Sequence, residues 1–459
     1  MKLYNSMTNT IEDFKPIKEG EVSIYTCGPT VYFYAHIGNL RTYVSEDILV
    51  RTLEYMGYDV KRAMNITDVG HIVGDADEGE DKMLQGAKRE KKTVWDIAKY
   101  YTDVFFEDFD SLNLKRPTYV SRATDHIDDY IEFIETLEKK GHTYRGGGNV
   151  YFDVSTFPEY NKLSKMPLEN LVHAHRDDVK MDENKKSPLD FVLWFTKSKF
   201  DDQEMKWDSP FGRGYPGWHL ECSVISLKML GEQMDIHCGG VDHIPTHHTN
   251  EIAQTESYTG KPWVKYWWHA EFLLDKSGKM SKSKGDFLDL RFLKSEGYTP
   301  MHYKYFLLGS HYRRQLTYTE EGLKNAKDAY EKLKERTLKL EAPVKTDAYL
   351  DKFNETIGND LDTANALTII YEVLKDKALS SGEKRYILEE IDSVLQLDLF
   401  KEEEKSVDID EAFIQGKIQE RSEAKANKDY AKADAIREEL QGMGITLMDG
   451  KDGTTWKMN

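Results

Sequence analysis

The sequence has 459 residues, of which 39% are hydrophobic and 31% are charged, with 12 prolines and 31 glycines. This composition is typical of a folded protein of about three domains and excludes a disordered chain. The formal net charge of -18 argues against nucleic-acid binding, because phosphates favour a basic partner. A local basic groove on an acidic protein is still sufficient for RNA.

Targeting signals and disulfide bonds are not expected. The sequence contains no run of about 18 apolar residues, so we predict no membrane-spanning helix. The first residues, MKLYNSMTNTIEDFKP, lack the basic and apolar regions of a signal peptide. The three cysteines, Cys27, Cys222 and Cys238, are too few and too scattered for a disulfide framework. We therefore expect a cytoplasmic protein with no membrane partner.

The N-terminal region alternates between strand and helix patterns. EVSIYTCG (21–28) predicts a strand, residues 39–60 have hydrophobic residues at helical spacing, and VKRAMNITDVG (60–70) predicts a second strand. This order is typical of a parallel α/β unit, in which ligands bind at the carboxyl ends of the strands. Cys27 and Asn65–Asp68 lie at such ends. The acidic segment 75–82 is interpreted as a solvated loop.

The later composition predicts three further regions. The α/β pattern resumes after a stretch of glycine turns and short strands, and regularly spaced Leu and Ile then predict a helical bundle. Two short helices and a tail follow a charged break. We predict a Rossmann-like parallel-sheet catalytic domain (1–114 and 206–315), an inserted connective subdomain (115–205), an α-helical bundle (316–402) and a small C-terminal module (403–459).

Two motifs flank the α/β region and suit a nucleotide. HIGN, His36 to Asn39, lies between a strand end and a helix start, where free N–H groups and a partial positive charge favour a phosphate. Gly38 leaves room for a flat base against the backbone. KMSKS supplies Lys279 and Lys282, which can neutralise a pyrophosphate as its charge develops. Each motif alone is weak, whereas the pair is specific.

A third group of residues has the chemistry of a metal site. His247 and Glu251 in THHTNE are four residues apart and share one face if the stretch is helical. Together with Cys27 and Cys222 they offer the thiolate, imidazole and carboxylate ligands that zinc binds in a tetrahedron. Spacing alone does not define this site, because ordinary buried thiols are commoner and His248 could equally replace His247.

The strings TCGPTVYFYAHIGNLR, PLDFVLWF, PGWHLECS, DIHCGGVDHIPTHHTNEIAQ, KMSKSKG and GTTW resemble cysteinyl-tRNA synthetases, which are class I aminoacyl-tRNA synthetases. The resemblance covers essentially the whole chain. It implies a ligase that activates L-cysteine with ATP to cysteinyl-adenylate and transfers it to the 3′ end of tRNA(Cys). It also implies Mg²⁺ with the ATP and one Zn²⁺ per subunit, which binds the substrate thiolate. The implied zinc ligands are Cys27, Cys222, His247 and Glu251.

The resemblance also divides the remaining site residues between the substrates. The implied cysteine-binding residues are Gly28, Thr67, Trp218 and His237. The implied ATP-binding residues are His36, Gly38, Asn39, Asp242, Lys279 and Lys282, and those with a catalytic role are His36, Asn39, Lys279 and Lys282. From the residues alone, Trp218 could be a core residue, His237 a structural histidine and Asp242 a turn cap. Asn39 stands where the family's motif has a second histidine. At the position of Cys238 the family often has glycine, and we do not expect Cys238 to bind zinc.

The C-terminal regions resemble the parts of class I synthetases that contact tRNA. The bundle resembles the helical bundle that contacts the anticodon stem of the tRNA in those enzymes. The last module resembles the small domain that recognises the cysteine anticodon. The basic residues of its helical hairpin are Arg421, Lys425, Lys428, Lys432 and Arg437. Without the resemblance, these residues would be a solvated charged face. Trp456 either stacks on an unpaired base or anchors the tail. We expect a monomer.

Two other functions are compatible with parts of this pattern. A ligase that joins cysteine to an amino sugar would share the adenylate and zinc pocket but lack the anticodon-reading end, so the tail through GTTW favours the synthetase. A non-catalytic zinc- or RNA-binding relative is disfavoured by the presence of His36, Lys279 and Lys282.

Overall fold

The computed structural model describes residues 1–69, 82–174, 182–197, 205–275, 278–279, 288–402, 411–427, 429–442, 445–450 and 453–458. Its contacts divide the chain into two units, Met1–Phe400 and Lys401–Asn459. Within the described ranges, no helix is both long enough and apolar enough to cross a membrane. Of the segments singled out above, Lys282 and nearly all of the acidic loop 75–82 lie outside the described residues.

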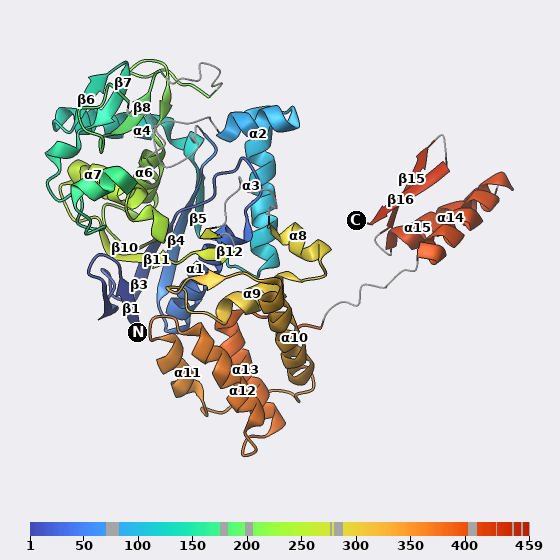
Figure 1. Ribbon diagram of the computed structural model, residues 1–459. Coiled ribbons are helices and arrows are strands. Elements are labelled where there is room, and N and C mark those ends of the chain that lie inside the picture. Colours follow the sequence, from blue (N-terminus) through green and yellow to red (C-terminus); the bar gives the residue numbers. More distant parts are fainter. Residues whose placement is uncertain are drawn as a thin grey trace. The chain divides into compact units, whose positions relative to one another are not determined.

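A five-stranded parallel sheet organises the first unit (Figure 1). Its spatial order is β11-β10-β3-β4-β5, so β3, the first of these strands in the chain, lies beside the later strand β10. The chain changes direction across the sheet between these two strands, and this is where open α/β sheets bind ligands. The strands are β3 (Glu21–Thr26), β4 (Asp59–Ile66), β5 (Tyr119–Arg122), β10 (Met234–Gly240) and β11 (Val264–Ala270).

Helices cover both faces of this sheet because successive side chains of each strand point to opposite sides. Ile24 of β3 packs in a core that includes Leu40 of the first helix, whereas Tyr25 packs with Cys222 and Ile252 of two later helices. Figure 1 shows α6 and α7 on one side of the sheet and α3 on the other. The helices are α1 (Ile37–Tyr55), α2 (Lys82–Glu90), α3 (Val94–Ser111), α6 (Trp218–Leu230) and α7 (His247–Thr259).

The inserted region forms an antiparallel sheet of its own, in the order β6-β7-β8-β9. Its elements are β6 (Thr143–Gly146), β7 (Asn149–Phe152), β8 (Phe191–Phe195), β9 (Tyr215–Pro216), α4 (Ile127–Lys139) and α5 (Leu168–Ala174). The predicted insert, residues 115–205, differs from this sheet at both ends. It includes β5, which pairs with β4 of the main sheet, and omits β9, which pairs with β8. Both strands are short, and only long-range pairing assigns them to a sheet.

The predicted helical bundle shares a single hydrophobic core with the main sheet. Ile370 and Ile391 belong to the same buried cluster as Ile24 and Leu40. A capping box at Ser380 and Glu383 begins the last of these helices. The elements of this part are α8 (Leu290–Ser295), α9 (Pro300–Leu308), α10 (Glu320–Thr337), α11 (Leu350–Ile357), α12 (Thr363–Lys375) and α13 (Ser381–Leu395), with the short strands β12 (Leu273–Asp275), β13 (Gly278–Lys279) and β14 (Leu316–Thr317).

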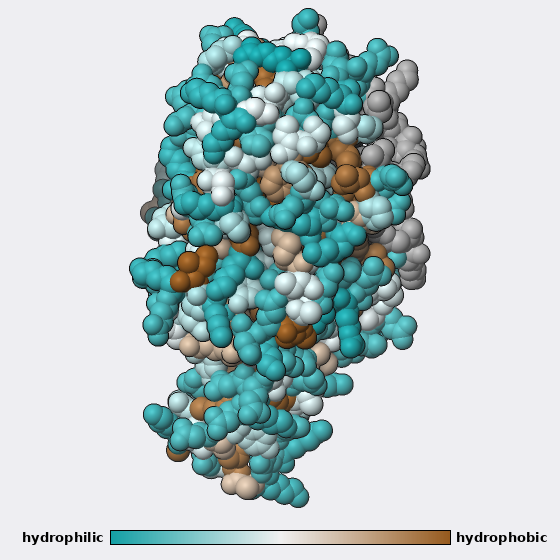
Figure 2. Space-filling model, turned by 90° about the vertical axis from the view of Figure 1, so that its left-hand side faces the viewer, coloured by the Kyte–Doolittle hydropathy of each residue, from teal (hydrophilic) through white to brown (hydrophobic). Residues whose placement is uncertain are grey.

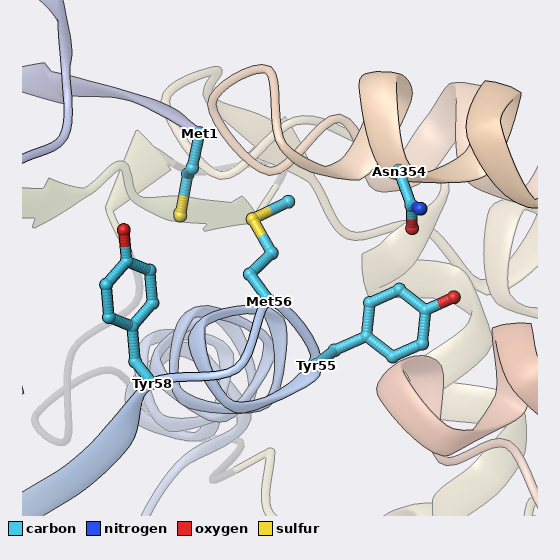
Figure 3. Close-up of a pocket in the computed structure, with 5 residues that line it drawn as sticks. All are labelled: Met1, Tyr55, Met56, Tyr58 and Asn354. Carbon is cyan, nitrogen blue, oxygen red and sulfur yellow. The ribbon is translucent and has the colours of Figure 1, made fainter. Parts of the chain in front are cut away.

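A short N-terminal hairpin and a shallow cavity lie near this bundle. The hairpin pairs β1 (Lys2–Asn5) with β2 (Thr10–Asp13), and the Lys2 N–H donates to the Gly358 carbonyl at 2.7 Å. The cavity is about 550 Å³ and has no charged side chain in its lining (Figure 3). The lining residues are Met1, Tyr55, Met56, Tyr58 and Asn354. None of them is a predicted site residue, and we assign no ligand to the cavity.

The second unit has a small core of its own, formed by Ile414, Ile436, Leu440, Ile445 and Leu447. It comprises α14 (Glu411–Ala426), α15 (Tyr430–Gly442), β15 (Ile445–Gly450) and β16 (Gly453–Met458). The two predicted helices are present, whereas the β15–β16 hairpin was not predicted. Trp456 lies opposite Leu447 in this hairpin and packs against the core.

One basic residue of the helical hairpin differs from expectation. Arg421 is 3% exposed, so it does not belong to a solvated basic face. Lys425, Lys432 and Arg437 are exposed, and Lys432 pairs with Glu420 at 2.9 Å. Lys428 lies outside the described residues.

On the face of the protein in Figure 2, hydrophobic side chains lie in small groups that hydrophilic residues separate. This pattern agrees with the high content of charged residues. The domain boundaries and the monomeric state stay predictions.

Candidate active site

The ends of three parallel strands meet at the predicted site. Cys27 follows β3, and its N–H donates to the carbonyl of Cys238 in β10 at 3.3 Å. The N–H of Gly28 donates to Asn65 Oδ1, near the end of β4, at 2.8 Å. A Cβ atom at Gly28 would overlap the carbonyl oxygen of Asn65, so only glycine allows the strands this close approach. Thr67 comes directly after β4, in the same place.

The four predicted metal ligands converge beside these strand ends. THHTNE begins α7, so His247 and Glu251 share a helix face as expected, and Cys222 comes from α6. Cys222 Sγ lies 3.9 Å from Cys27 Sγ and 3.5 Å from His247 Nε2. In a tetrahedral zinc site the corresponding separations are about 3.8 Å and about 3.6 Å. The ligand atoms of all four residues lie within 4.8 Å of one another.

The carboxylate of Glu251 tests whether this site fits a cation. Its Oε2 contacts His237 Nε2 at 2.7 Å in a hydrogen bond. Its Oε1 lies 2.7 Å from His247 Nε2, yet it is buried without a hydrogen-bond partner. A buried carboxylate oxygen without a donor is costly. An imidazole nitrogen and a carboxylate oxygen that converge to 2.7 Å without hydrogen-bond geometry fit two ligands of one ion.

A second combination of side chains is also close enough to share an ion. It consists of Cys27, His237, His248 and Glu251, whose ligand atoms lie within 4.8 Å of one another. Cys27 Sγ is 3.4 Å from His248 Nε2. This set contains one thiolate, whereas the predicted set contains two and therefore suits zinc better. In addition, His237 Nε2 already binds the carboxylate.

Electrostatics separate the ionisable groups of this cluster. Burial raises the pKa of Cys222, but a hydrogen bond from Cys27 and the charge of His247 outweigh this and lower it to about 7. Burial also raises the pKa of Glu251, and the neighbouring imidazoles of His247 and His237 lower it below its ordinary value. Burial, followed by His237, lowers the pKa of His248, so that ring is neutral at neutral pH.

The predicted cysteine pocket borders the same cluster. Trp218 begins α6 and stacks on the His247 ring, with centroids 4.1 Å apart and planes 25° apart. Thr67 Oγ1 donates to Glu221 Oε2 at 2.6 Å. His237 is fully buried and bonded to Glu251. Its expected contact with the substrate carboxylate stays a prediction.

The start of α1 has the features expected of a phosphate site. His36 is the N-cap residue, and its Nδ1 accepts a hydrogen bond from the Asn39 N–H at 3.1 Å. The neutral ring therefore carries its proton on Nε2, where it is a donor. A Cβ atom at Gly38 would lie 2.9 Å from His36 Nδ1.

Strand β12 brings the HIGN and KMSKS motifs close to each other. Leu274 of β12 pairs with Lys279 of β13, and its neighbour Leu273 lies 3.9 Å from the Cβ position of Gly38. The Lys279 backbone is thus brought near the start of α1, and Lys282 lies outside the described residues. Asp242 lies in the 3₁₀ turn η3 (Val241–His243), directly after β10.

Comparison with known proteins identifies the family. A family model described as the class I (C) tRNA synthetase catalytic domain matches residues 13–328. A second one, described as the cysteinyl-tRNA ligase anticodon binding domain, matches residues 418–456. A cysteine--tRNA ligase from Treponema denticola is 47% identical over 100% of this chain and 99% of its own. The chain belongs to the cysteinyl-tRNA synthetase family.

Other relatives agree with this family and its fold. A cysteine--tRNA ligase 1 from Burkholderia lata is 43% identical over 99% of this chain and 96% of its own. A Mycobacterium tuberculosis methionyl-tRNA synthetase bound by methionyl-adenylate has a TM-score of 0.54 at 15% identity and covers 82% of this chain and 90% of that chain. The predicted family and the class I, Rossmann-like fold are confirmed.

Several residues beside this cysteinyl-tRNA synthetase site were not predicted. His219 Nδ1 lies 3.0 Å from His247 Nδ1, so it can fix the tautomer that leaves His247 Nε2 available to a metal. His248 is held in the same way by His269 at 2.8 Å. The spacing of His219 and Cys222 on one helix face could have indicated the first contact. The second depends on sheet order, for which the sequence has no local signal.

Proposed function

We propose that this protein is a cysteine–tRNA ligase that activates L-cysteine with ATP and transfers it to the 3′ end of tRNA(Cys). The observation that carries the proposal is the convergence of Cys27, Cys222, His247 and Glu251 at the ends of β3 and β10. Full-length relatives named cysteine--tRNA ligase support the same activity.

We also propose that these four side chains hold one Zn²⁺ per subunit. Their spacing supports this assignment, as does the contact of Glu251 Oε1 with His247 Nε2, which forms no hydrogen bond. Packing contacts distinguish substrates that differ by one small group by only about 1–3 kcal/mol, too little to exclude serine and alanine. Zinc, when bound, accepts the substrate thiolate as an additional ligand and lowers the pKa of that thiol.

The chain's own residues then position cysteine. Trp218 supplies an apolar wall next to His247. Gly28 allows the close approach of β3 and β4 that forms the floor of the predicted cysteine pocket. Thr67 offers a hydroxyl that Glu221 orients. In this scheme His237 contributes by orienting Glu251, with the substrate carboxylate as its further predicted contact.

The start of α1 and the KMSKS lysines carry the adenylation step. The cysteine carboxylate attacks the α-phosphorus of ATP, the bond to the β-phosphate oxygen breaks, and pyrophosphate leaves. His36 Nε2–H, Lys279 and Lys282, with the Mg²⁺ that accompanies ATP, stabilise the developing charge. Gly38 and Asn39 border the nucleotide, and Asp242 holds the ribose hydroxyls.

No strong general base is needed in this scheme, because the carboxylate is already a nucleophile and positioning does the rest. In the second step the terminal ribose hydroxyl of the tRNA attacks the cysteinyl carbonyl, and AMP leaves. We propose that the unit Lys401–Asn459 reads the anticodon, with Lys425, Lys432 and Arg437 as exposed cations for the phosphates.

Metal analysis combined with cysteine-dependent exchange of pyrophosphate into ATP tests the proposal. We expect about one zinc per chain in the wild type, and its loss in Cys222→Ser with a fall in exchange of roughly 100-fold or more. Cys238→Ser is the matched control, because Cys238 is buried but belongs to neither possible ligand set, and it should retain the metal. A zinc-free wild type that still selects cysteine over serine would overturn the assignment.

The alternative that also activates cysteine is a ligase that transfers cysteine to an amino sugar instead of tRNA. The anticodon-binding match over residues 418–456 favours tRNA as the acceptor. Charging of tRNA(Cys), compared with transfer to an amino sugar by the same protein, decides between them. Failure of both transfers and of the exchange reaction would instead indicate a non-catalytic relative.

A further inference from the structure

The two helices that carry metal ligands also form part of the core of the insert. On one side, Cys222 and Ile225 of α6 and Ile252 of α7 pack in a cluster against the main sheet. On the other side, Leu220 and Val224 of α6 and Ala253 of α7 are buried with residues of the insert. The insert is therefore the outer wall of the metal cluster. Its packing helps to set where both helices lie.

One polar contact from the insert reaches the turn of α7 that presents the ligands. Tyr160 lies in the insert after the 3₁₀ turn η2 (Val154–Thr156) and is 2% exposed. Its hydroxyl donates to Oδ1 of Asn250, which is itself buried. Asn250 lies between His247 and Glu251 in the same helical turn. A hydrogen bond that holds the Asn250 side chain therefore also fixes the positions of both proposed ligands.

Other contacts between the insert and α7 lie farther along the helix. Phe133 stacks on Tyr258, with centroids 4.3 Å apart. Lys162 pairs with Glu256, and Lys140 donates to the carbonyl of Ser257 at 3.2 Å. These contacts hold the carboxyl-terminal half of the helix. The Tyr160 contact acts on its first turn.

We propose that Tyr160 is a positioning residue for the metal site: its hydroxyl, through Asn250, fixes the turn of α7 that carries His247 and Glu251. This inference rests on the proposed zinc site. A metal binds most tightly when its ligands are already held at the required separation, and here Glu251 Oε1 is 2.7 Å from His247 Nε2. Loss of the hydroxyl leaves Asn250 Oδ1 buried without its donor and loosens that turn.

The test compares Tyr160→Phe with Tyr151→Phe in the full-length protein. Tyr151 is a fully buried tyrosine of the same insert, and its hydroxyl donates to Asp182, which also belongs to the insert. We expect zinc to dissociate into excess chelator about fivefold faster from Tyr160→Phe than from the wild type. The KM for cysteine should rise by a similar factor while the KM for ATP is unchanged. Tyr151→Phe should show neither effect.

A double-mutant cycle shows whether Asn250 transmits the effect. We expect Tyr160→Phe combined with Asn250→Ala to release zinc no faster than Asn250→Ala alone, because both changes remove the same bond. If the zinc-release rate of the double variant increased by the product of the two single-variant factors, the two changes would act independently and the inference would be overturned. Equal acceleration in Tyr160→Phe and Tyr151→Phe would also overturn it, since the effect would then be a general loosening of the insert.

The outcomes also separate this inference from the proposed function. A wild type that holds no zinc, or shows no cysteine-dependent exchange, contradicts the proposed function itself. A wild type that does both, with Tyr160→Phe releasing zinc at the wild-type rate, leaves that function in place and overturns only the role of Tyr160.

Discussion

Lys304 is a charged residue inside the core that joins the sheet to the helical bundle. It lies on α9 and is fully buried, and its Nζ donates to the Leu112 carbonyl at 2.9 Å. Asp47 is 3.9 Å from it and also accepts from Arg51 at 2.8 Å. Burial lowers the pKa of the Lys304 ammonium to about 8, although Asp47 opposes this shift.

This shift predicts a rise in stability with pH. Between pH 8 and the ordinary lysine value of about 10.4, the unfolded chain binds a proton at Lys304 that the folded chain does not. The free energy of unfolding therefore gains up to ~3 kcal/mol from this residue across that interval. The measurement is the guanidinium chloride concentration at the midpoint of unfolding, for the wild type and for Lys304→Met, from pH 7.5 to 10.5. The difference between the two proteins should change in favour of the wild type as pH rises, and parallel curves would contradict the prediction.

The proposed metal cluster shows how far single site residues can be predicted from the sequence. Residue types and short strings indicated all four proposed ligands, and the structure brings these side chains together. The choice between His247 and His248 was open because adjacent residues of a helix both reach a deep site. The two thiolates of the predicted set and the bond from His237 to Glu251 are the reasons to prefer His247.

At the scale of elements, the start of α1 combines a structural role with a chemical one. His36 caps the helix through Nδ1. In the proposed mechanism its Nε2–H also donates to a phosphate. His36→Ala should lose both, at a cost of about 1 kcal/mol in stability and roughly 100-fold in pyrophosphate exchange.

His36→Ser separates the two roles. Serine is a preferred N-cap but is too short to replace the imidazole donor, so the thermal midpoint should stay near that of the wild type while exchange falls as far as in His36→Ala. Wild-type exchange in His36→Ser would show that the imidazole does no more than cap the helix.

Local patterns predicted the elements that depend on local contacts. The strand, helix and strand expected at the start of the first unit are present as β3, α1 and β4. The β15–β16 hairpin was missed. The hairpin is held by cross-strand neighbours such as Leu447 and Trp456, and the insert boundaries depend on the pairing of β5 and β9. Such pairings between distant segments have no local signal.

At the scale of the whole molecule, the division at Phe400 separates two cores. The helices α10 to α13 share the core of the sheet, whereas α14, α15 and the terminal hairpin have another. A chain that ends at Phe400 should therefore fold and keep cysteine-dependent exchange within about twofold of the wild type.

Charging of tRNA by this shortened chain should fall by roughly 100-fold or more, since each lost base contact costs about 1–3 kcal/mol. The two reactions measured on one preparation check this prediction. Equal losses in both would mean that the last unit supports the catalytic fold, and unchanged charging would remove its role in reading the anticodon.

The sequence positions of the four proposed ligands also constrain the order of events at the ribosome. Cys27 is synthesised early, whereas Glu251 follows only after the insert and α6 are complete. At about 5–20 residues per second, the interval is on the order of ten seconds or more. During this time the Cys27 thiol has none of its partners and must stay reduced. With the proposed zinc site, metal capture would be a late event in biogenesis, after the first β–α–β unit has been synthesised.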